Sequence, residues 1–251
     1  SYSVTGVQTC ALPISIMVSS HLELIAQWLS EHPASLSSLK TVVSSSALLR
    51  PDIKQRCIDL FDCDFHECYG ASEVGIVTNL APADCRDNLA SVGKALDYVE
   101  LAILDETGRA LPSGHIGEIA CRTKTAFSGY YHRADATATS MRDGYFCTGD
   151  VGHVDKDGFL HLAGRKKDII IVGGSNVYPD DVEAVLREAP GVKDCSVIGV
   201  PDSYFGEATL AVITTDSSDI DLRRIRVFCA ERLADFQQPQ AYEILDELPR
   251  T

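Results

Sequence analysis

The order of secondary-structure signals changes twice along the 251 residues, and these changes limit the possible folds more than any other feature. Helical and strand patterns alternate as far as Tyr69. Beyond Gly93, short strands are separated by turn signals such as Asp155-Lys156-Asp157-Gly158. After Gly164, strands and helices mix again. We therefore expect an α/β part with a small β region, then a small α+β domain, with the boundary between Gly164 and Asp168.

The first part shows apolar residues at near-helical spacing from Ile16 to Leu29, which predicts a helix. Leu39 to Val43 is typical of a short buried strand, and Phe65 to Tyr69 of a second one. Pro51 to Phe61 should form a helix that its proline opens. Alternating elements of this kind are typical of a parallel sheet.

The last part contains patterns for a small mixed domain. Its expected strands are 169–172, 196–200, 208–214 and 242–245, and its expected helices are 179–188 and 222–233. The helix from Pro179 has acidic residues in its first turn, where they stabilise a helix.

Charge and hydropathy exclude several classes of partner. Asp and Glu number 36 against 22 Lys and Arg, and the resulting net charge of -14 repels nucleic acid and anionic membrane surfaces. No run of about 18 apolar residues is present, so no spanning helix is expected and a cytoplasmic location is predicted.

The nine cysteines are odd in number and scattered, which favours buried free thiols over disulfides. Cys63, His66 and Cys68 offer soft ligands for zinc. They lack a second ligand pair at matching spacing, so a metal site is the weaker interpretation.

The first segment does not match the rest of the chain. Val4 to Ile14 lacks the basic start and long apolar core of a signal peptide. It is identified as the translation of a common sequencing-adaptor oligonucleotide, so residues 1–15 are expected to be an artefactual leader. An ordinary first strand and turn is the alternative.

Tyr69-Gly70-Ala71-Ser72-Glu73 follows an expected strand, the usual place for a nucleotide in an α/β sheet. Tyr69 offers an aromatic plane for a purine, Ser72 a hydroxyl for phosphate, and Glu73 a hard carboxylate for magnesium. An ordinary tight turn is the alternative.

Three later motifs also suit a nucleotide. In Gly144 to Asp150 a glycine turn delivers a carboxylate that could accept two ribose hydroxyls, or that could merely cap a turn. Gly164 to Asp168 carries three cations, which could contact ribose or phosphate or form a solvated charge run. Gly173 to Pro179 lets the backbone approach a ligand closely, or is simply the loop before a helix.

In this order and at these intervals, the four motifs resemble the adenylate-forming superfamily of acyl-CoA synthetases, luciferases and peptide-synthetase adenylation domains. The family's YGxTE motif matches 69–73 with serine for threonine, its TGD motif matches 148–150, and its GRxKD hinge matches 164–168. The resemblance implies that residues 16–164 are the carboxy-terminal part of the large AMP-binding domain. Residues 165–251 would be the small carboxy-terminal domain.

The resemblance also implies roles for single residues. Tyr69 would stack on adenine with Gly70 and Ala71 beside it, and Ser72 would contact phosphate. Glu73 would hold Mg2+. Ser72 and Glu73 would therefore be the catalytic residues.

Asp150 and Arg165 would bind ribose, and Asp168 would be the hinge about which the small domain turns. Gly173 and Gly174 would line the CoA channel.

One family segment departs from its usual SGGAPL sequence. It aligns with Ser44 to Leu49, so Ser46 and Ala47 would line the adenine. Serines stand where the family has two glycines, which would tighten or shift the adenine pocket.

The implied reaction activates a small-molecule carboxylic acid with ATP and Mg2+ as acyl-AMP, and then transfers the acyl group to the CoA thiol. Such a reaction depends on positioning and on stabilising negative charge. The family's phosphate loop lies upstream of anything present, and its catalytic lysine follows the Leu-Pro-Arg-Thr stretch that ends at Thr251. An inactive, incomplete fragment of an acyl-CoA ligase is therefore expected.

Ser175 to Pro179 favours a CoA ligase over a peptide-synthetase domain. The alternatives are an enzyme that loads a carrier protein and a non-catalytic nucleotide-binding or interaction module. The sequence leaves the acyl or aryl acid and the oligomeric state open.

Overall fold

The computed structural model describes residues 13–216 and 220–249, which form two compact units. The amino-terminal unit comprises residues 13–148 and 152–162, and the carboxy-terminal unit comprises 149–151 together with the described residues from 163 onward. The division of the family domains at residues 164 and 165 stays a prediction.

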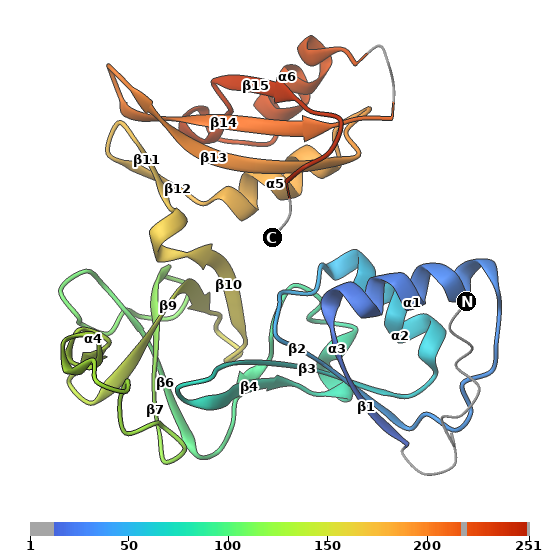
Figure 1. The fold of residues 1–251 in the computed structure, drawn as a ribbon, viewed down its shortest axis with the longest axis vertical. Helices are drawn as coiled ribbons and strands as arrows, with labels where there is room; N and C mark the ends of the chain where they lie inside the picture. Colours follow the sequence, from blue (N-terminus) through green and yellow to red (C-terminus); the bar gives the residue numbers. More distant parts are fainter. Residues whose placement is uncertain (1–12, 217–219, 250–251) are drawn as a thin grey trace. The chain divides into compact units, whose positions relative to one another are not determined.

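The amino-terminal unit begins with alternating strands and helices (Figure 1). The elements are β1 (Ile14–Val18), α1 (Ser19–Glu31), β2 (Thr41–Ser45), α2 (Pro51–Phe61), β3 (Asp64–Ala71), β4 (Gly75–Leu80), α3 (Pro82–Cys85) and β5 (Lys94–Ala95). In the sheet order β1-β2-β3-β4-β5, the first three strands are parallel and β4 and β5 are antiparallel to their neighbours. The predicted α/β alternation is confirmed, including the helix that Pro51 opens.

The predicted start of the first helix is wrong. Ile16 lies in β1, where it pairs with Val43, and α1 begins only at Ser19. The β-branched residues Ile14, Ile16 and Val18 favour an extended backbone, and Leu22 is the first residue that α1 buries.

Two helices cover one face of this sheet. Figure 1 shows α1 and α2 side by side over β1, β2 and β3, and their buried faces meet the strands in a single core. Leu22 and Ala26 of α1 and Phe61 of α2 pack there with Val42 and Phe65.

A second sheet confirms the antiparallel β region expected beyond Gly93. It contains β6 (Val99–Leu104), β7 (Gly117–Thr123), β8 (Met141–Arg142), β9 (Tyr145–Val154) and β10 (Leu160–Arg165) in the order β10-β9-β7-β6, with β8 on β9. The short helix α4 (Ala134–Thr139) precedes β8.

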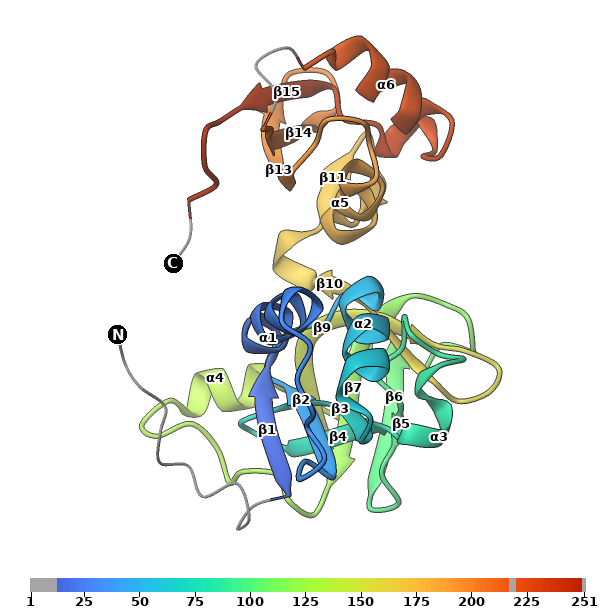
Figure 2. The ribbon, with the colours of Figure 1, turned by 90° about the vertical axis from the view of Figure 1, so that its right-hand side faces the viewer.

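The carboxy-terminal unit is the expected α+β arrangement. It contains η1 (Lys166–Asp168), β11 (Ile170–Val172), β12 (Ser175–Val177), α5 (Pro179–Arg187), β13 (Asp194–Asp202), β14 (Gly206–Thr214), α6 (Leu222–Ala230), η2 (Asp235–Gln237) and β15 (Ala241–Ile244). Figure 2 shows α5 and α6 beside the β13–β14 pair, and one core joins these elements. Val182, Leu186 and Ile225 of the helices pack there against Val197 and Ile213 of the strands.

Candidate functional site

The carboxyl ends of β2 and β3 lie at the same edge of the first sheet, because the two strands are parallel and Ser44 pairs with Glu67. The segments that follow both strands therefore emerge at this edge, although β3 continues past its last pair with β2 as far as Ala71. Ser46, Ala47 and Ser72 are exposed there. The structure thus places the two predicted nucleotide segments of this unit at one edge of the sheet.

The turn from β3 to β4 is built around Gly70. A Cβ at this position would lie 2.1 Å from the carbonyl oxygen of Gly75, so the close approach of the two strands requires glycine. The turn also needs glycine at its end, since Gly75 has a φ of +76°. Together they place Ser72 and Glu73 at the tip of a tight turn.

A segment from Thr123 to Tyr130, here called the strap, holds this turn. The backbone N–H of Phe127 donates to the carbonyl oxygen of Glu73 at 2.6 Å, and the Thr125 hydroxyl donates to the Val74 carbonyl oxygen at 2.6 Å. The Tyr130 phenol donates to Oε1 of Glu73 at 2.7 Å. This hydrogen bond raises the pKa of Tyr130, because the neutral phenol is the form that donates.

Tyr69, which is predicted to stack on adenine, is largely buried. Its side chain is only 9% exposed and packs in a core with Val74, Val77 and Val92. Stacking on adenine would have to use the small part of the ring that remains open, and it stays a prediction.

Ser46 adopts a backbone conformation that favours glycine. Its φ is +79°, in the left-handed region, where a Cβ costs about 1–3 kcal/mol. The hydroxyl of Ser19 donates to the carbonyl oxygen of the next residue, Ala47, at 2.7 Å. Glycine adopts this φ without steric cost, which explains the glycine that the adenylate-forming superfamily has at this position. In this chain, the backbone of Ser46 is strained instead.

A buried ion pair lies behind the same edge. Lys54 of α2 and Glu67 of β3 are 1% and 2% exposed and form a direct contact. Lys54 also donates to the carbonyl oxygen of Ser91 at 2.8 Å, and Glu67 accepts from the backbone N–H of Leu49 at 3.3 Å. The pair therefore ties the segment after β2 to the core. Burial raises the pKa of Glu67, and the nearby Lys54 ammonium opposes this shift.

In the carboxy-terminal unit, Asp150 and Arg165 form an ion pair with 2.8 Å between Oδ1 and Nε. Asp150 is 15% exposed and Arg165 is 56% exposed, so the pair is open to a ligand from the guanidinium side. A carboxylate and a guanidinium held together in this way offer both an acceptor and donors for vicinal hydroxyls.

The predicted hinge residue, Asp168, ends the short helix η1. Gly164 precedes it with a φ of +122°, and a Cβ there would lie 3.4 Å from Oδ2 of Asp180. Burial raises the pKa of Asp180, and the Asp168 carboxylate raises it further, while Arg187 opposes both effects.

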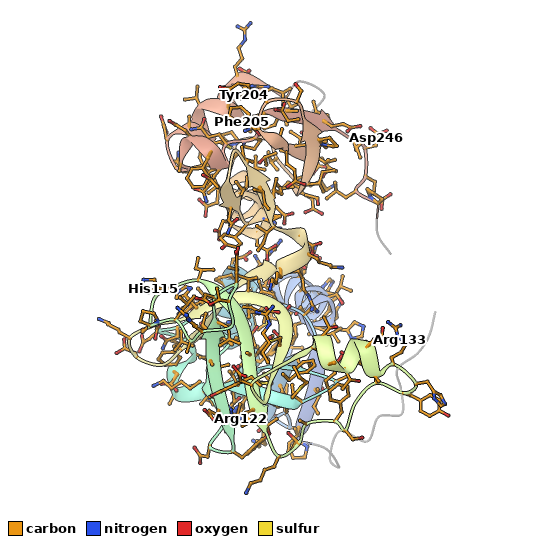
Figure 3. All side chains as sticks on the ribbon, turned by 90° about the vertical axis from the view of Figure 1, so that its left-hand side faces the viewer. His115, Arg122, Arg133, Tyr204, Phe205 and Asp246 are labelled. Carbon is orange, nitrogen blue, oxygen red and sulfur yellow. The ribbon has the colours of Figure 1, made fainter. Side chains whose placement is uncertain are left out.

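Gly173 and Gly174 form the two-residue turn of the β11–β12 hairpin, which the pair Val172 and Ser175 closes. Their φ values of +58° and +87° suit the turns that match the twist of a hairpin. Gly173 donates its backbone N–H to the carbonyl oxygen of Phe205 at 3.0 Å. Figure 3 shows the exposed aromatic residues Tyr204 and Phe205 at the neighbouring turn.

His66 and Cys68, two residues of the possible zinc site, both contact the side chain of Asn79. His66 Nδ1 lies 3.1 Å from the Asn79 side-chain oxygen, which also accepts from the Cys68 thiol. Among the residues that the structure describes, no group of three or more His, Cys, Asp or Glu could hold a metal ion.

Two cysteines outside this cluster are deeply buried. Burial raises the pKa of the Cys57 and Cys195 thiols to about 12, which keeps both neutral.

A hard cation shared with a phosphate fits the residues at the β3–β4 turn better. One carboxylate, Glu73, stands beside the exposed hydroxyl of Ser72. Magnesium typically binds one or two carboxylates together with water and substrate phosphates, so this donor set suits it.

Two contacts near the candidate site escaped the sequence patterns. Tyr130 meets Glu73 across 57 residues, and no local signal marks it. Lys54 and Glu67 could have been noticed as charges within an apolar helix face and an apolar strand.

Within the described ranges 13–216 and 220–249, no helix is long and apolar enough to cross a membrane.

Comparison with known proteins relates these features to a family. Residues 6–131 match the family of AMP-binding enzymes, and residues 181–251 match the AMP-binding enzyme C-terminal domain. A putative acyl-CoA ligase of Bacillus subtilis (strain 168), YdaB, is 37% identical over 229 residues, which are 90% of this chain and 45% of that protein. The chain thus spans about half the length of the curated relatives that it matches.

Two solved structures are also similar. The amide bond synthetase McbA from Marinactinospora thermotolerans has a TM-score of 0.83 at 35% identity, covering 94% of this chain and 48% of that one. The o-succinylbenzoate CoA synthetase MenE from Bacillus subtilis, in complex with ATP and a magnesium ion, has a TM-score of 0.82 at 28% identity, covering 94% and 48%. On the matched residues and the shared fold, the chain belongs to the AMP-binding, adenylate-forming enzyme family, among the relatives of acyl-CoA ligases.

Proposed function

We propose that this chain supplies part of the ATP site of an acyl-CoA ligase, which activates a carboxylic acid as acyl-AMP and passes the acyl group to CoA. The observation that carries the proposal is the edge where β2 and β3 end. There, the exposed Ser46 and Ala47 follow β2, and the exposed Ser72 follows β3 beside the Glu73 carboxylate, which accepts a hydrogen bond from Tyr130 of the strap.

Each predicted site residue has a role in this proposal. Ser46 and Ala47 border the adenine, with Gly70, Ala71 and the open part of Tyr69 on the opposite side. Ser72 donates a hydrogen bond to a phosphate oxygen. Glu73 would hold Mg2+, which would supply positive charge to stabilise negative charge on the phosphates.

In the carboxy-terminal unit, the predicted residues have roles toward ribose and toward CoA. Asp150 accepts hydrogen bonds from the ribose hydroxyls, and Arg165 donates to ribose or phosphate. Asp168 serves as the hinge between the two half-reactions, and the Gly173-Gly174 turn borders the CoA channel.

Pyrophosphate release measures the first half-reaction of the family. A protein that contains this sequence at the full length of its relatives should release pyrophosphate only when a carboxylic acid, ATP and Mg2+ are all present. Replacing Glu73 with Gln should reduce that rate by at least about 100-fold, since a metal-binding charge is lost. Carboxylate-independent release, or an unchanged rate in Glu73→Gln, would argue against the proposal.

The product of the second half-reaction distinguishes the acceptors. A thioester with CoA supports the ligase, and loading of a phosphopantetheinyl protein supports the carrier-protein alternative. An amide formed with an added amine would instead place the chain closer to the amide bond synthetase that it resembles at 35% identity.

A further inference from the structure

The hydrogen bond between Tyr130 and Glu73 ties the tip of the β3–β4 turn to the strap. The phenol oxygen lies 2.7 Å from Oε1, a favourable distance for an O–H donor and a carboxylate. Glu73 is the residue to which the proposed function assigns Mg2+, and the inference below rests on that proposal.

Several contacts position Tyr130. The backbone N–H of Tyr130 donates to the Thr137 hydroxyl at 2.9 Å, and its carbonyl oxygen accepts from the backbone N–H of Arg133 at 3.1 Å. The Phe127 ring meets the Tyr130 ring edge-on, with 4.8 Å between centroids. The start of α4, where Figure 3 labels Arg133, therefore holds the backbone of Tyr130, and Phe127 of the strap packs against its ring.

The backbone of Glu73 is equally fixed. The Phe127 N–H binds the Glu73 carbonyl oxygen, and Thr125 binds the carbonyl oxygen of the next residue, Val74. Only the side-chain torsions of Glu73 remain free, so the phenol decides how the carboxylate is oriented.

The two oxygens of this carboxylate differ in their contacts. Oε1 accepts from Tyr130, whereas Oε2 has no hydrogen-bond or ion-pair partner among the residues that the structure describes. A divalent cation needs a carboxylate oxygen that is held still and not already occupied.

We propose that Tyr130 is a positioning residue for the metal-binding carboxylate: its phenol occupies Oε1 of Glu73 and leaves Oε2 for a divalent cation. Loss of the hydroxyl should leave the fold intact while the carboxylate samples several orientations. Hydrogen-bond partners of metal ligands typically change metal affinity by about 10- to 100-fold.

The variant Tyr130→Phe removes one hydroxyl and keeps the aromatic packing on Phe127. A matched control is Tyr131→Phe, which makes the same change one residue later. Tyr131 is 88% exposed, and its hydroxyl has no partner in the described part of the chain.

The first readout needs no ligand. In the chain with 13C-labelled glutamate carboxyl groups, Glu73→Gln identifies the Glu73 signal by its loss. This signal should shift in Tyr130→Phe and stay in place in Tyr131→Phe. A Glu73 signal that is unchanged in Tyr130→Phe would overturn the proposal.

The second readout is Mn2+ binding in the presence of ATP, measured by electron paramagnetic resonance. Tyr130→Phe should weaken Mn2+ binding about tenfold relative to Tyr131→Phe, at an equal thermal midpoint. Equal Mn2+ affinity in these two variants would also overturn the positioning role. If the unaltered chain binds no Mn2+ with ATP, the Glu73 carboxyl signal decides the role of Tyr130, and pyrophosphate release by the full-length protein decides the proposed function.

Discussion

The two units secure their candidate sites in different ways. In the amino-terminal unit, the Lys54–Glu67 pair is almost fully buried behind the site, and the strap holds the turn in front. In the carboxy-terminal unit, the Asp150–Arg165 pair is itself part of the site, and Arg165 is 56% exposed. Substitutions should therefore destabilise the fold in the first unit and mainly weaken ligand binding in the second.

The largest effect is expected from Lys54→Met, which leaves the Glu67 carboxylate buried without its counter-charge. We expect a loss of about 3–5 kcal/mol in the free energy of unfolding of the amino-terminal unit. Trp28 in α1 is the only tryptophan, so its fluorescence during urea unfolding reports on this unit alone.

Two variants test the cause of this loss. The double variant Lys54→Met, Glu67→Leu removes both charges and should recover most of the stability. Arg86→Met breaks an exposed pair with Asp59 in the same unit, so it should leave the unfolding transition almost unchanged. A double variant as unstable as Lys54→Met would show that packing, and not the unpaired charge, causes the loss.

The loss of stability caused by replacing a turn glycine should also differ between the units. Gly70→Ala places a Cβ 2.1 Å from the Gly75 carbonyl oxygen, so the turn must open, at a cost of about 3 kcal/mol. Gly174→Ala meets no atom within 4 Å and pays only for its φ of +87°, about 1 kcal/mol. Urea unfolding followed by Trp28 fluorescence for the first and by amide hydrogen exchange for the second measures each cost, and equal costs would contradict the difference.

Asp150→Asn should separate stability from binding. An ion pair with such an exposed partner contributes at most about 1 kcal/mol, so unfolding should barely change. AMP affinity should fall about tenfold, since a charged hydrogen bond to ribose contributes about 1.5–3 kcal/mol. The control Asp157→Asn changes an exposed carboxylate on the turn between β9 and β10, and calorimetry should find its AMP affinity unchanged.

The smallest expected effect is an opposite response of the two units to pH. Burial, and then the stacked His161 ring, lower the pKa of His153 below its ordinary 6.5. The unfolded chain then binds the proton more readily, so His153 makes the amino-terminal unit lose stability as the pH falls below 6.5.

In the carboxy-terminal unit, burial raises the pKa of Asp180, Asp181 and Glu183 on α5. Here the folded form binds protons more readily, so these groups make the unit lose stability as the pH rises through their raised pKa values. His153→Asn and Asp180→Asn should each reduce the pH dependence of their own unit, measured by hydrogen exchange at pH 5 and pH 7.5. A smaller pH dependence of the carboxy-terminal unit in His153→Asn, or of the amino-terminal unit in Asp180→Asn, would contradict these assignments.

Local signals predicted most of the fold, because they act within a few residues. Pro51 begins α2, and Gly173 with Gly174 turns the β11–β12 hairpin, as their intrinsic φ preferences require. The start of α1 was mispredicted because Ile16 suits both a helix face and a strand, and only its pairing with Val43 decides between them.

The site was predictable only where its chemistry lies in one short motif. Glu73 stands out in such a motif, whereas the position of its carboxylate depends on Tyr130, 57 residues away. The limited exposure of Tyr69 likewise results from packing against Val77 and Val92, which its own motif does not reveal.

The central claim is that residues 46–47, 69–73, 150 and 165 contact a nucleotide, and titration of the 15N-labelled chain with AMP tests it most directly. At millimolar AMP, we expect the amide signals of residues 46–47, 69–73, 150 and 165 to move, and those of α6 to stay in place. Unmoved signals at these positions, or shifts confined to other parts of the chain, would contradict the claim.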